Sequence, residues 1–124
     1  MREVVNLDEV FASFDDRWSP RIVAAINDYD VKIVHVAGEF VWHDHADTDE
    51  FFLVLAGRLV IDLDHPALPS QVELTPGEVY VVPRGVAHRP VADEGTRLLL
   101  LEPRGTVNTG DSEADGTAGL PVTD

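Results

Sequence analysis

The chain has 124 residues, of which 44% are hydrophobic and 26% charged, as in an ordinary globular domain. It contains no cysteine, which excludes disulfides, cysteine-ligated metal sites and thiol nucleophiles. Twenty-three acidic residues against nine Lys and Arg give a net charge of −14, which disfavours nucleic acid and anionic membranes as partners.

Membrane and secretory signals are missing from the hydropathy pattern. No apolar run approaches the roughly 20 residues that span a bilayer. The first residues, Met1–Asn6, lack the apolar segment of a secretory signal. We therefore expect a cytoplasmic protein without a membrane partner, whose chemistry depends on His, Asp, Glu, Tyr or Arg.

Residues 1–20 are predicted to form a short helical lead-in. Asn6 and Glu9 have the spacing of a capping box, and apolar residues between positions 10 and 14 follow with helical spacing. Trp18 and Pro20 are expected to end this segment. Its aromatic side chains are predicted to attach it to the core of the domain.

Residues 21–103 show the pattern of an all-β domain. Short runs rich in Val, Ile, Leu and Phe alternate with turn residues, and no long helical pattern interrupts them. Several runs are apolar on both faces, which suggests a second sheet inside and a partner subunit or the lead-in outside. The nine predicted strands are 22–26, 31–37, 40–45, 50–55, 58–63, 71–74, 79–82, 88–91 and 97–102.

Residues 104–124 form the third predicted segment. They are polar, acidic and rich in glycine, and we expect a tail that is mobile or lies along the surface. The predicted organisation is therefore a lead-in, one β domain and a tail.

Histidines and a glutamate suggest a metal site. On a strand, His43 and His45 would project to the same side with their Cα atoms about 6–7 Å apart. A turn after His45 allows the next strand to aim Glu50 at the same point, and His88 follows a second tight turn. Three imidazoles and one carboxylate would leave a transition metal about two open positions. A His-x-His pair on a strand also occurs by chance on surfaces and in cores, and that interpretation stays open on spacing alone.

Glycines bound two motifs that contain the histidines, Gly38-x4-His43-x-His45-x4-Glu50-x6-Gly57 and Gly77-x5-Pro83-x-Gly85-x2-His88. The order and spacing of the two motifs resemble small single-domain cupins of the Cupin_2 type, with an RmlC-like jelly roll. The first gap has four residues where the common pattern has five, and Ala92 stands where the second motif often has Asn.

The resemblance implies a double-stranded β-helix, the cupin jelly-roll barrel, with a metal inside it. By motif position its ligands would be His43, His45, Glu50 and His88. The implied cofactor is one divalent transition metal: Fe, Mn, Ni, Co or Zn.

Strand alternation predicts a mostly apolar pocket around this site. Other polar residues, namely Tyr80, Arg89 and Glu102, could reach the pocket, but a packing or solvated role is favoured for each. His35 could join the pocket from an earlier strand, although a role in packing is favoured. The residues predicted to line the pocket are Val41, Phe52, Val54, Pro90 and His35.

Two classes of function are favoured for such a protein over a scaffold that keeps only the fold, because all four ligand types are present. The first is a small-molecule metalloenzyme of dioxygenase, isomerase or lyase type, and the apolar lining favours an aromatic or weakly polar substrate. A sugar phosphate of the kind that mannose-6-phosphate isomerase takes is disfavoured, because the chain has few cationic residues that could bind it. The second is a non-catalytic module that binds or senses a small ligand or a metal. The two-faced apolar strands favour a homodimer.

Overall fold

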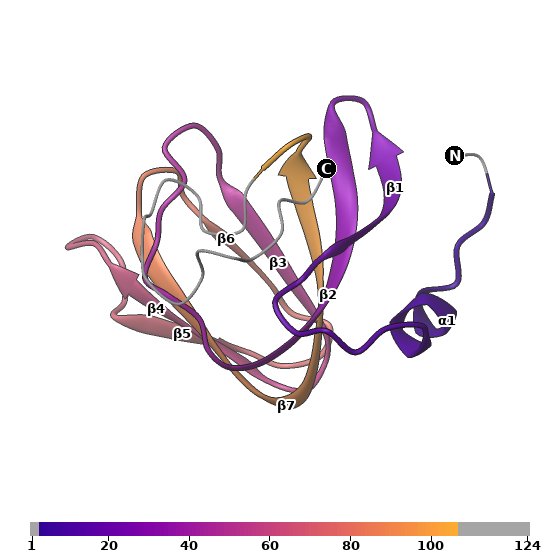
Figure 1. Cartoon of the computed structure of the whole chain (residues 1–124). Helices are drawn as coiled ribbons and strands as arrows, with labels where there is room; N and C mark the ends of the chain where they lie inside the picture. The colour runs from indigo at the N-terminus through magenta and orange to yellow at the C-terminus, as the bar shows by residue number, and fades with distance from the viewer. Residues whose placement is uncertain (1–2, 107–124) are drawn as a thin grey trace.

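The computed structural model describes residues 3–106, which form a small barrel of antiparallel strands with one short helix outside it (Figure 1). The predicted all-β jelly roll is confirmed. The part of the predicted tail beyond residue 106 lies outside the described residues. The elements are α1 (Leu7–Ala12), β1 (Arg21–Ile26), β2 (Tyr29–Glu39), β3 (Glu50–Ala56), β4 (Leu59–Asp64), β5 (Gln71–Leu74), β6 (Val79–Val82) and β7 (Ala87–Pro103).

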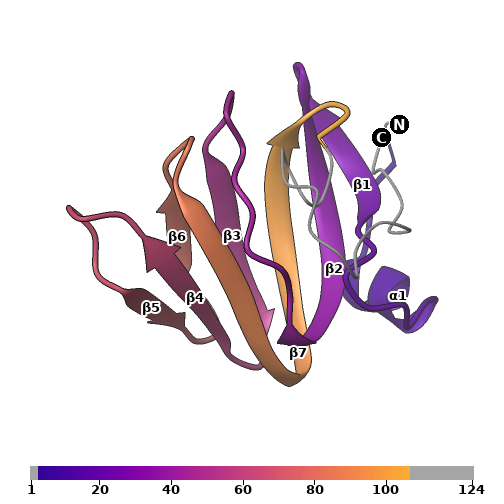
Figure 2. The same ribbon diagram turned by 60° about the vertical axis from the view of Figure 1, so that its left-hand side comes forward.

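The long strand β7 connects the two halves of the barrel. Five strands follow the order β1-β2-β7-β3-β6, and β4 pairs with both β7 and β5. The first part of β7, from Ala87 to Ala92, pairs with β4, whereas residues 97–101 pair with β3. Between these parts β7 bends sharply, so one strand pairs in both halves of the barrel (Figures 1 and 2). The two strands predicted at 88–91 and 97–102 are therefore one strand.

The predicted strand over 40–45 is wrong. Gly38 has φ +79, the β2–β7 register shifts between Val36 and Gly38, and the ladder continues only to Glu39, where β2 ends. Beyond this point the chain stays next to β7 through single contacts. The Phe40 N–H donates to the carbonyl of Pro90 at 2.9 Å, and His43 forms an isolated bridge with His88.

The lead-in contains a six-residue helix that is capped as the sequence predicts. The Asn6 side chain accepts a hydrogen bond from the Glu9 N–H at 3.0 Å. The helix ends at Ala12, before the predicted end at Trp18, because both the N–H and the hydroxyl of Ser13 bond to the Val10 carbonyl.

Alternation along the strands fills the barrel with aliphatic side chains. Every second residue of β3 and β4 is buried, as the period of a half-buried strand requires. The core consists of Val34, Val36, Phe52, Val54, Leu59, Ile61, Leu63, Leu74, Val82, Val86, Ala92, Leu98 and Leu100.

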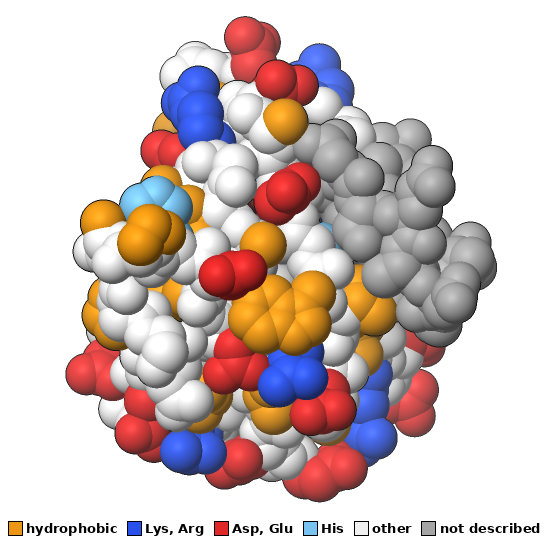
Figure 3. Space-filling view, turned by 90° about the vertical axis from the view of Figure 1, so that its left-hand side faces the viewer, with side chains coloured by type: hydrophobic (Ala, Val, Ile, Leu, Met, Phe, Trp, Pro, Cys, Tyr) orange, Lys and Arg blue, Asp and Glu red, His pale blue; other side chains and the backbone are white. Residues whose placement is uncertain are grey.

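Acidic side chains spread over the surface without gathering into one patch on the face that Figure 3 shows. Within residues 3–106 there is no helix of the length and apolar character that crossing a membrane requires. The cytoplasmic location and the lack of nucleic-acid and membrane partners stay predictions.

Candidate metal centre

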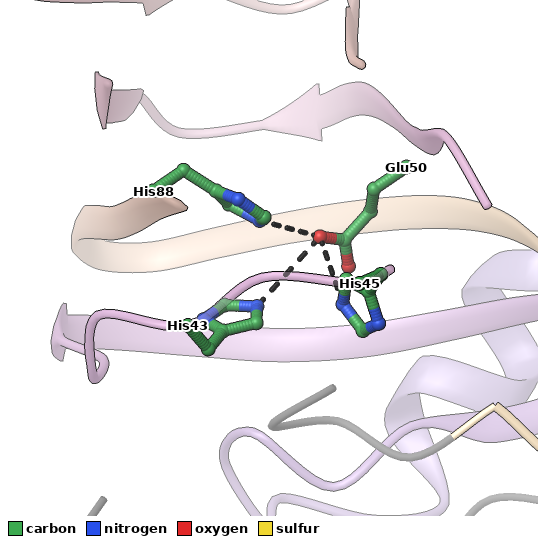
Figure 4. A group of neighbouring side chains, drawn as sticks. All are labelled: His43, His45, Glu50 and His88. Carbon is green, nitrogen blue, oxygen red and sulfur yellow. Dashed lines mark hydrogen bonds and ion pairs between the residues drawn. The ribbon is translucent and has the colours of Figure 1, made fainter. Parts of the chain in front are cut away.

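Three imidazoles and one carboxylate meet inside the barrel. The Nε2 atoms of His88, His45 and His43 lie 2.6, 3.3 and 3.7 Å from Oε1 of Glu50 (Figure 4). Each residue offers one ligand atom, and these four atoms lie within 4.8 Å of one another. All four residues are buried, with at most 6% of their surface exposed. The structure thus brings together the four residues that the sequence nominated.

Backbone hydrogen bonds hold the segments that carry the histidines. His43 and His88 exchange two bonds, from the His43 N–H at 3.0 Å and from the His88 N–H at 2.9 Å. The Gly85 N–H donates to the His45 carbonyl at 2.8 Å, and Gly85 has φ +77, which favours glycine at this turn. The Arg84 N–H donates to the Asp49 carboxylate at 2.9 Å. The two loops that carry the cluster are therefore tied to each other.

Carbonyl groups orient two of the rings. Nδ1 of His43 lies 2.9 Å from the Val41 carbonyl, and Nδ1 of His88 lies 2.9 Å from the Val86 carbonyl. Because a carbonyl only accepts, Nδ1 carries the hydrogen in both rings. Nε2 is then the atom that faces Glu50 and can bind a metal, which is the outer hydrogen-bond pattern typical of metal-binding histidines.

The electrostatics favour an ionised Glu50. Burial raises the pKa of this carboxyl, but hydrogen bonds from His43, His45 and His88 outweigh the burial and hold the pKa well below its usual value. A negative carboxylate thus faces three imidazole nitrogens at physiological pH.

The donor set fits a transition-metal ion. Imidazole nitrogen and carboxylate oxygen suit Fe, Mn, Ni, Co and Zn, and ligands of one such ion stand roughly 3–4 Å apart. The separations in the cluster are comparable with this spacing. Four protein ligands would leave an octahedral ion two positions for other molecules, so the cluster suits binding of small molecules better than a purely structural role.

A narrow cavity reaches the cluster. His43 and Glu50 line it, and the centre of a water molecule can occupy about 40 Å³ of it, which is room for a few water molecules. The rest of its wall is mostly apolar. The other lining residues are Trp18, Pro20, Val34, Val36, Phe40, Phe52, Pro90, Leu98, Leu100 and Glu102.

Only some of the residues that the sequence predicted to line the pocket do so. Phe52 and Pro90 line the cavity, whereas Val54 is fully buried in the core. Val41 contributes its carbonyl to His43 and is not among the lining residues. His35 lies outside the cavity, where its ring packs between Phe11 and Phe14 and its Nε2 lies 3.0 Å from the Phe11 carbonyl. His35 therefore packs against the N-terminal lead-in and does not line the cavity.

Glu102 is the residue for which the favoured sequence interpretation was wrong. Its side chain is 3% exposed and lines the cavity. By contrast, Arg89 binds Asp62 at 2.8 Å, and Tyr80 is half-buried against the core. The alternation Leu98, Leu100, Glu102 gave a signal for an inward Glu102, but a charged residue near the end of a strand usually meets solvent.

An antiparallel barrel that encloses three histidines and one glutamate is the architecture of the cupins. Residues 31–102 match the cupin domain family Cupin_2, and the chain belongs to this family.

Individual relatives agree with this assignment. The chain is 29% identical over 102 residues to the uncharacterized protein YdbB of Bacillus subtilis (strain 168), covering 82% of this chain and 88% of YdbB. It is similar to a cupin-2 domain containing protein of Shewanella frigidimarina NCIMB 400, with 46% identity, a TM-score of 0.75, and coverage of 82% of this chain and 95% of the other.

One enzyme of known reaction is also similar in structure. It is the hydroquinone 1,2-dioxygenase PnpCD, solved in complex with Cd²⁺ and 4-hydroxybenzonitrile. The identity is 25% and the TM-score 0.66, with coverage of 81% of this chain and 72% of that chain.

Proposed function

We propose that the protein binds one divalent transition metal through His43, His45, Glu50 and His88 and acts on a small molecule at the open positions of the ion. The observation that carries this proposal is the convergence of the four ligand atoms beside a mostly apolar cavity. When bound, such an ion supplies Lewis-acid chemistry and, if it is iron or manganese, a site for O₂. The buried walls exclude bulk water from the reacting groups.

A dioxygenase acting on a small aromatic compound is the reaction class that the observations favour. The cavity walls are aliphatic and aromatic, and no Lys or Arg is among the described residues that line it, so a phosphate group would have no cationic partner there. The similarity to a hydroquinone 1,2-dioxygenase supports the same class. Isomerase and lyase reactions use comparable sites and are the alternatives within this proposal.

Oxygen uptake tests the reaction class. Protein loaded anaerobically with Fe²⁺ is mixed with hydroquinone in an oxygen-electrode cell, and we expect one O₂ consumed per hydroquinone lost. Metal-free protein and Fe²⁺ alone are the controls. Uptake no faster than that of Fe²⁺ alone, for hydroquinone and for a panel of substituted phenols, would exclude the dioxygenase.

A non-catalytic binding module is the second candidate, favoured by the small size of the cavity. In that case the metal-loaded protein would bind a small ligand in calorimetry but leave it chemically unchanged in oxygen-uptake and carbonyl-isomerisation assays.

We also propose a homodimer formed through the outer face of the sheet at β6. Val79 and Val81 on β6 are 51% and 44% exposed, and β6 is an edge strand in the sheet order. Sedimentation of the full chain at micromolar concentration is expected to give the dimer mass, and Val81→Glu is expected to shift it to the monomer. A monomer for the wild-type protein would exclude this assembly.

A further inference from the structure

Three charged side chains are buried together on β2 and β7, which lie side by side in Figure 1. Lys32 is 0% exposed, and Asp30 and Glu102 are each 3% exposed. Nζ of Lys32 lies 3.2 Å from Oε1 of Glu102, and the strand register sets Asp30 opposite Glu102. The cluster holds two carboxyl groups and one ammonium group, so it carries an excess negative charge when both carboxyls are ionised.

Glu102 connects this cluster to the metal centre. It lines the cavity together with His43 and Glu50. The β3–β7 register pairs Phe51 with Leu101, and the same register continued by one residue places Glu102 opposite Glu50. Both glutamates are buried, so they face the interior from neighbouring strands. A molecule at the open side of the metal centre would therefore lie beside the Glu102 carboxylate.

The hydrogen bonding of the charged cluster is incomplete. Within residues 3–106, Oδ2 of Asp30 is buried without a hydrogen-bond partner, and the buried Oε1 of Glu102 has only the ion-pair contact with the Lys32 ammonium group at 3.2 Å. Burial of an acceptor atom with incomplete hydrogen bonding costs free energy, and a hydrogen-bond donor on a bound molecule would recover part of this cost. Burial and the charge of Glu50 raise the pKa of Glu102 to about 7, against the lowering effect of Lys32. For stability alone, an apolar pair would serve as well as a buried ion pair.

We propose that Glu102, held in place by Lys32, is a ligand-binding residue that accepts a hydrogen bond from a hydroxyl group of the molecule bound at the metal centre. This inference rests on the proposed function, because it requires a ligand in the cavity. It narrows the ligand to a small hydroxylated compound with an apolar body. Carboxylates and phosphates are disfavoured because no Lys or Arg is among the described residues that line the cavity, and the ionised form of Glu102 repels them.

The test compares two probes of similar size, phenol and fluorobenzene, of which only phenol donates a hydrogen bond. Their affinities for the zinc-loaded protein are measured by calorimetry, in the wild type and in Lys32→Met/Glu102→Leu, which removes both members of the ion pair. Any preference for phenol that comes from zinc is common to both proteins and cancels in the comparison. We expect the preference for phenol over fluorobenzene to fall by about tenfold in the double variant.

Two further variants control for folding and for charge. Glu102→Gln keeps the shape and an acceptor oxygen, so it is expected to retain most of the preference for phenol. Arg89→Met/Asp62→Leu removes an ion pair outside the cavity and is expected to leave the preference unchanged.

The outcomes separate this inference from the proposed function. An unchanged preference in Lys32→Met/Glu102→Leu, with zinc still bound, would overturn it and leave the cluster as a structural ion pair. Failure of phenol to bind the zinc-loaded wild type would overturn it as well. Failure of the wild type to bind zinc or any other transition metal would instead contradict the proposed metal centre.

Discussion

Replacing His88 with alanine is expected to abolish stoichiometric metal binding. The change removes one of four proposed ligands, the one whose Nε2 lies 2.6 Å from Glu50. A lost ligand weakens metal affinity at least as much as a lost outer-shell partner, for which the loss is about 10- to 100-fold. Purified wild-type protein should carry about one transition-metal ion per chain by elemental analysis, and His88→Ala should carry almost none. Competition with a chelator gives the change in affinity.

The backbone bridge between His43 and His88 does not need the imidazole, so the variant should keep the barrel and lose the metal. Circular dichroism checks that the strands persist. His65→Ala is the matched control, because His65 is exposed and lies outside the four-residue cluster. Full metal content in His88→Ala would show that the proposed ligand set is wrong.

The second large effect is expected on stability, from Gly57→Ala. Gly57 lies between β3 and β4 with φ +84, where an L-residue is strained. A Cβ atom there would lie 2.6 Å from Cα of Thr96 and would contact the Thr96 side chain as well. Thr96 is 1% exposed, and its hydroxyl bonds to the Arg58 N–H at 3.0 Å and to the Asp93 carbonyl at 2.8 Å. The added methyl group thus collides with β7 close to its bend.

Strain and overpacking together are expected to lower the free energy of unfolding by roughly 3 kcal/mol or more, a large part of the ~5–15 kcal/mol typical of a domain. Urea unfolding of metal-free protein measures the change. Gly77→Ala is the control, since Gly77 has φ +88 but a Cβ there meets no atom within 4 Å. Its loss should be only about 1–2 kcal/mol. An equal loss of unfolding free energy in Gly57→Ala and Gly77→Ala would show that the contact with Thr96 does not contribute to the destabilisation.

The sequence predicted the fold class and the cluster because both depend on local patterns. Strand alternation gives the sheets, and turns on either side of His45 and His88 give the ligand segments. The course of β7 was not predictable in the same way. Asp93-Glu94-Gly95 has the composition of a turn, and only pairing with partners on both sides shows that the strand continues through it.

The position of Glu102 in the cavity could not be predicted from a local sequence pattern either. Its place opposite Asp30 and beside Lys32 depends on pairing between strands about 70 residues apart in sequence. No local pattern indicates that three charged residues will be buried together. The apolar wall formed by Leu98 and Leu100 also results from this pairing. Phe52, by contrast, could be predicted to line the cavity, because it lies two residues after Glu50 on the same strand.

The position of β7 at the end of the barrel sequence affects how the protein folds during its synthesis. Before residues 87–103 are synthesised, the strand pairs of the described chain comprise only three separate two-stranded ribbons: β1 with β2, β3 with β6, and β4 with β5. A lone ribbon of this kind is marginally stable in water. Ribosomes add about 5–20 residues each second, so the growing polypeptide spends several seconds with open sheet edges. Closure of the barrel is thus a late event, completed when its last strand joins all three ribbons at once.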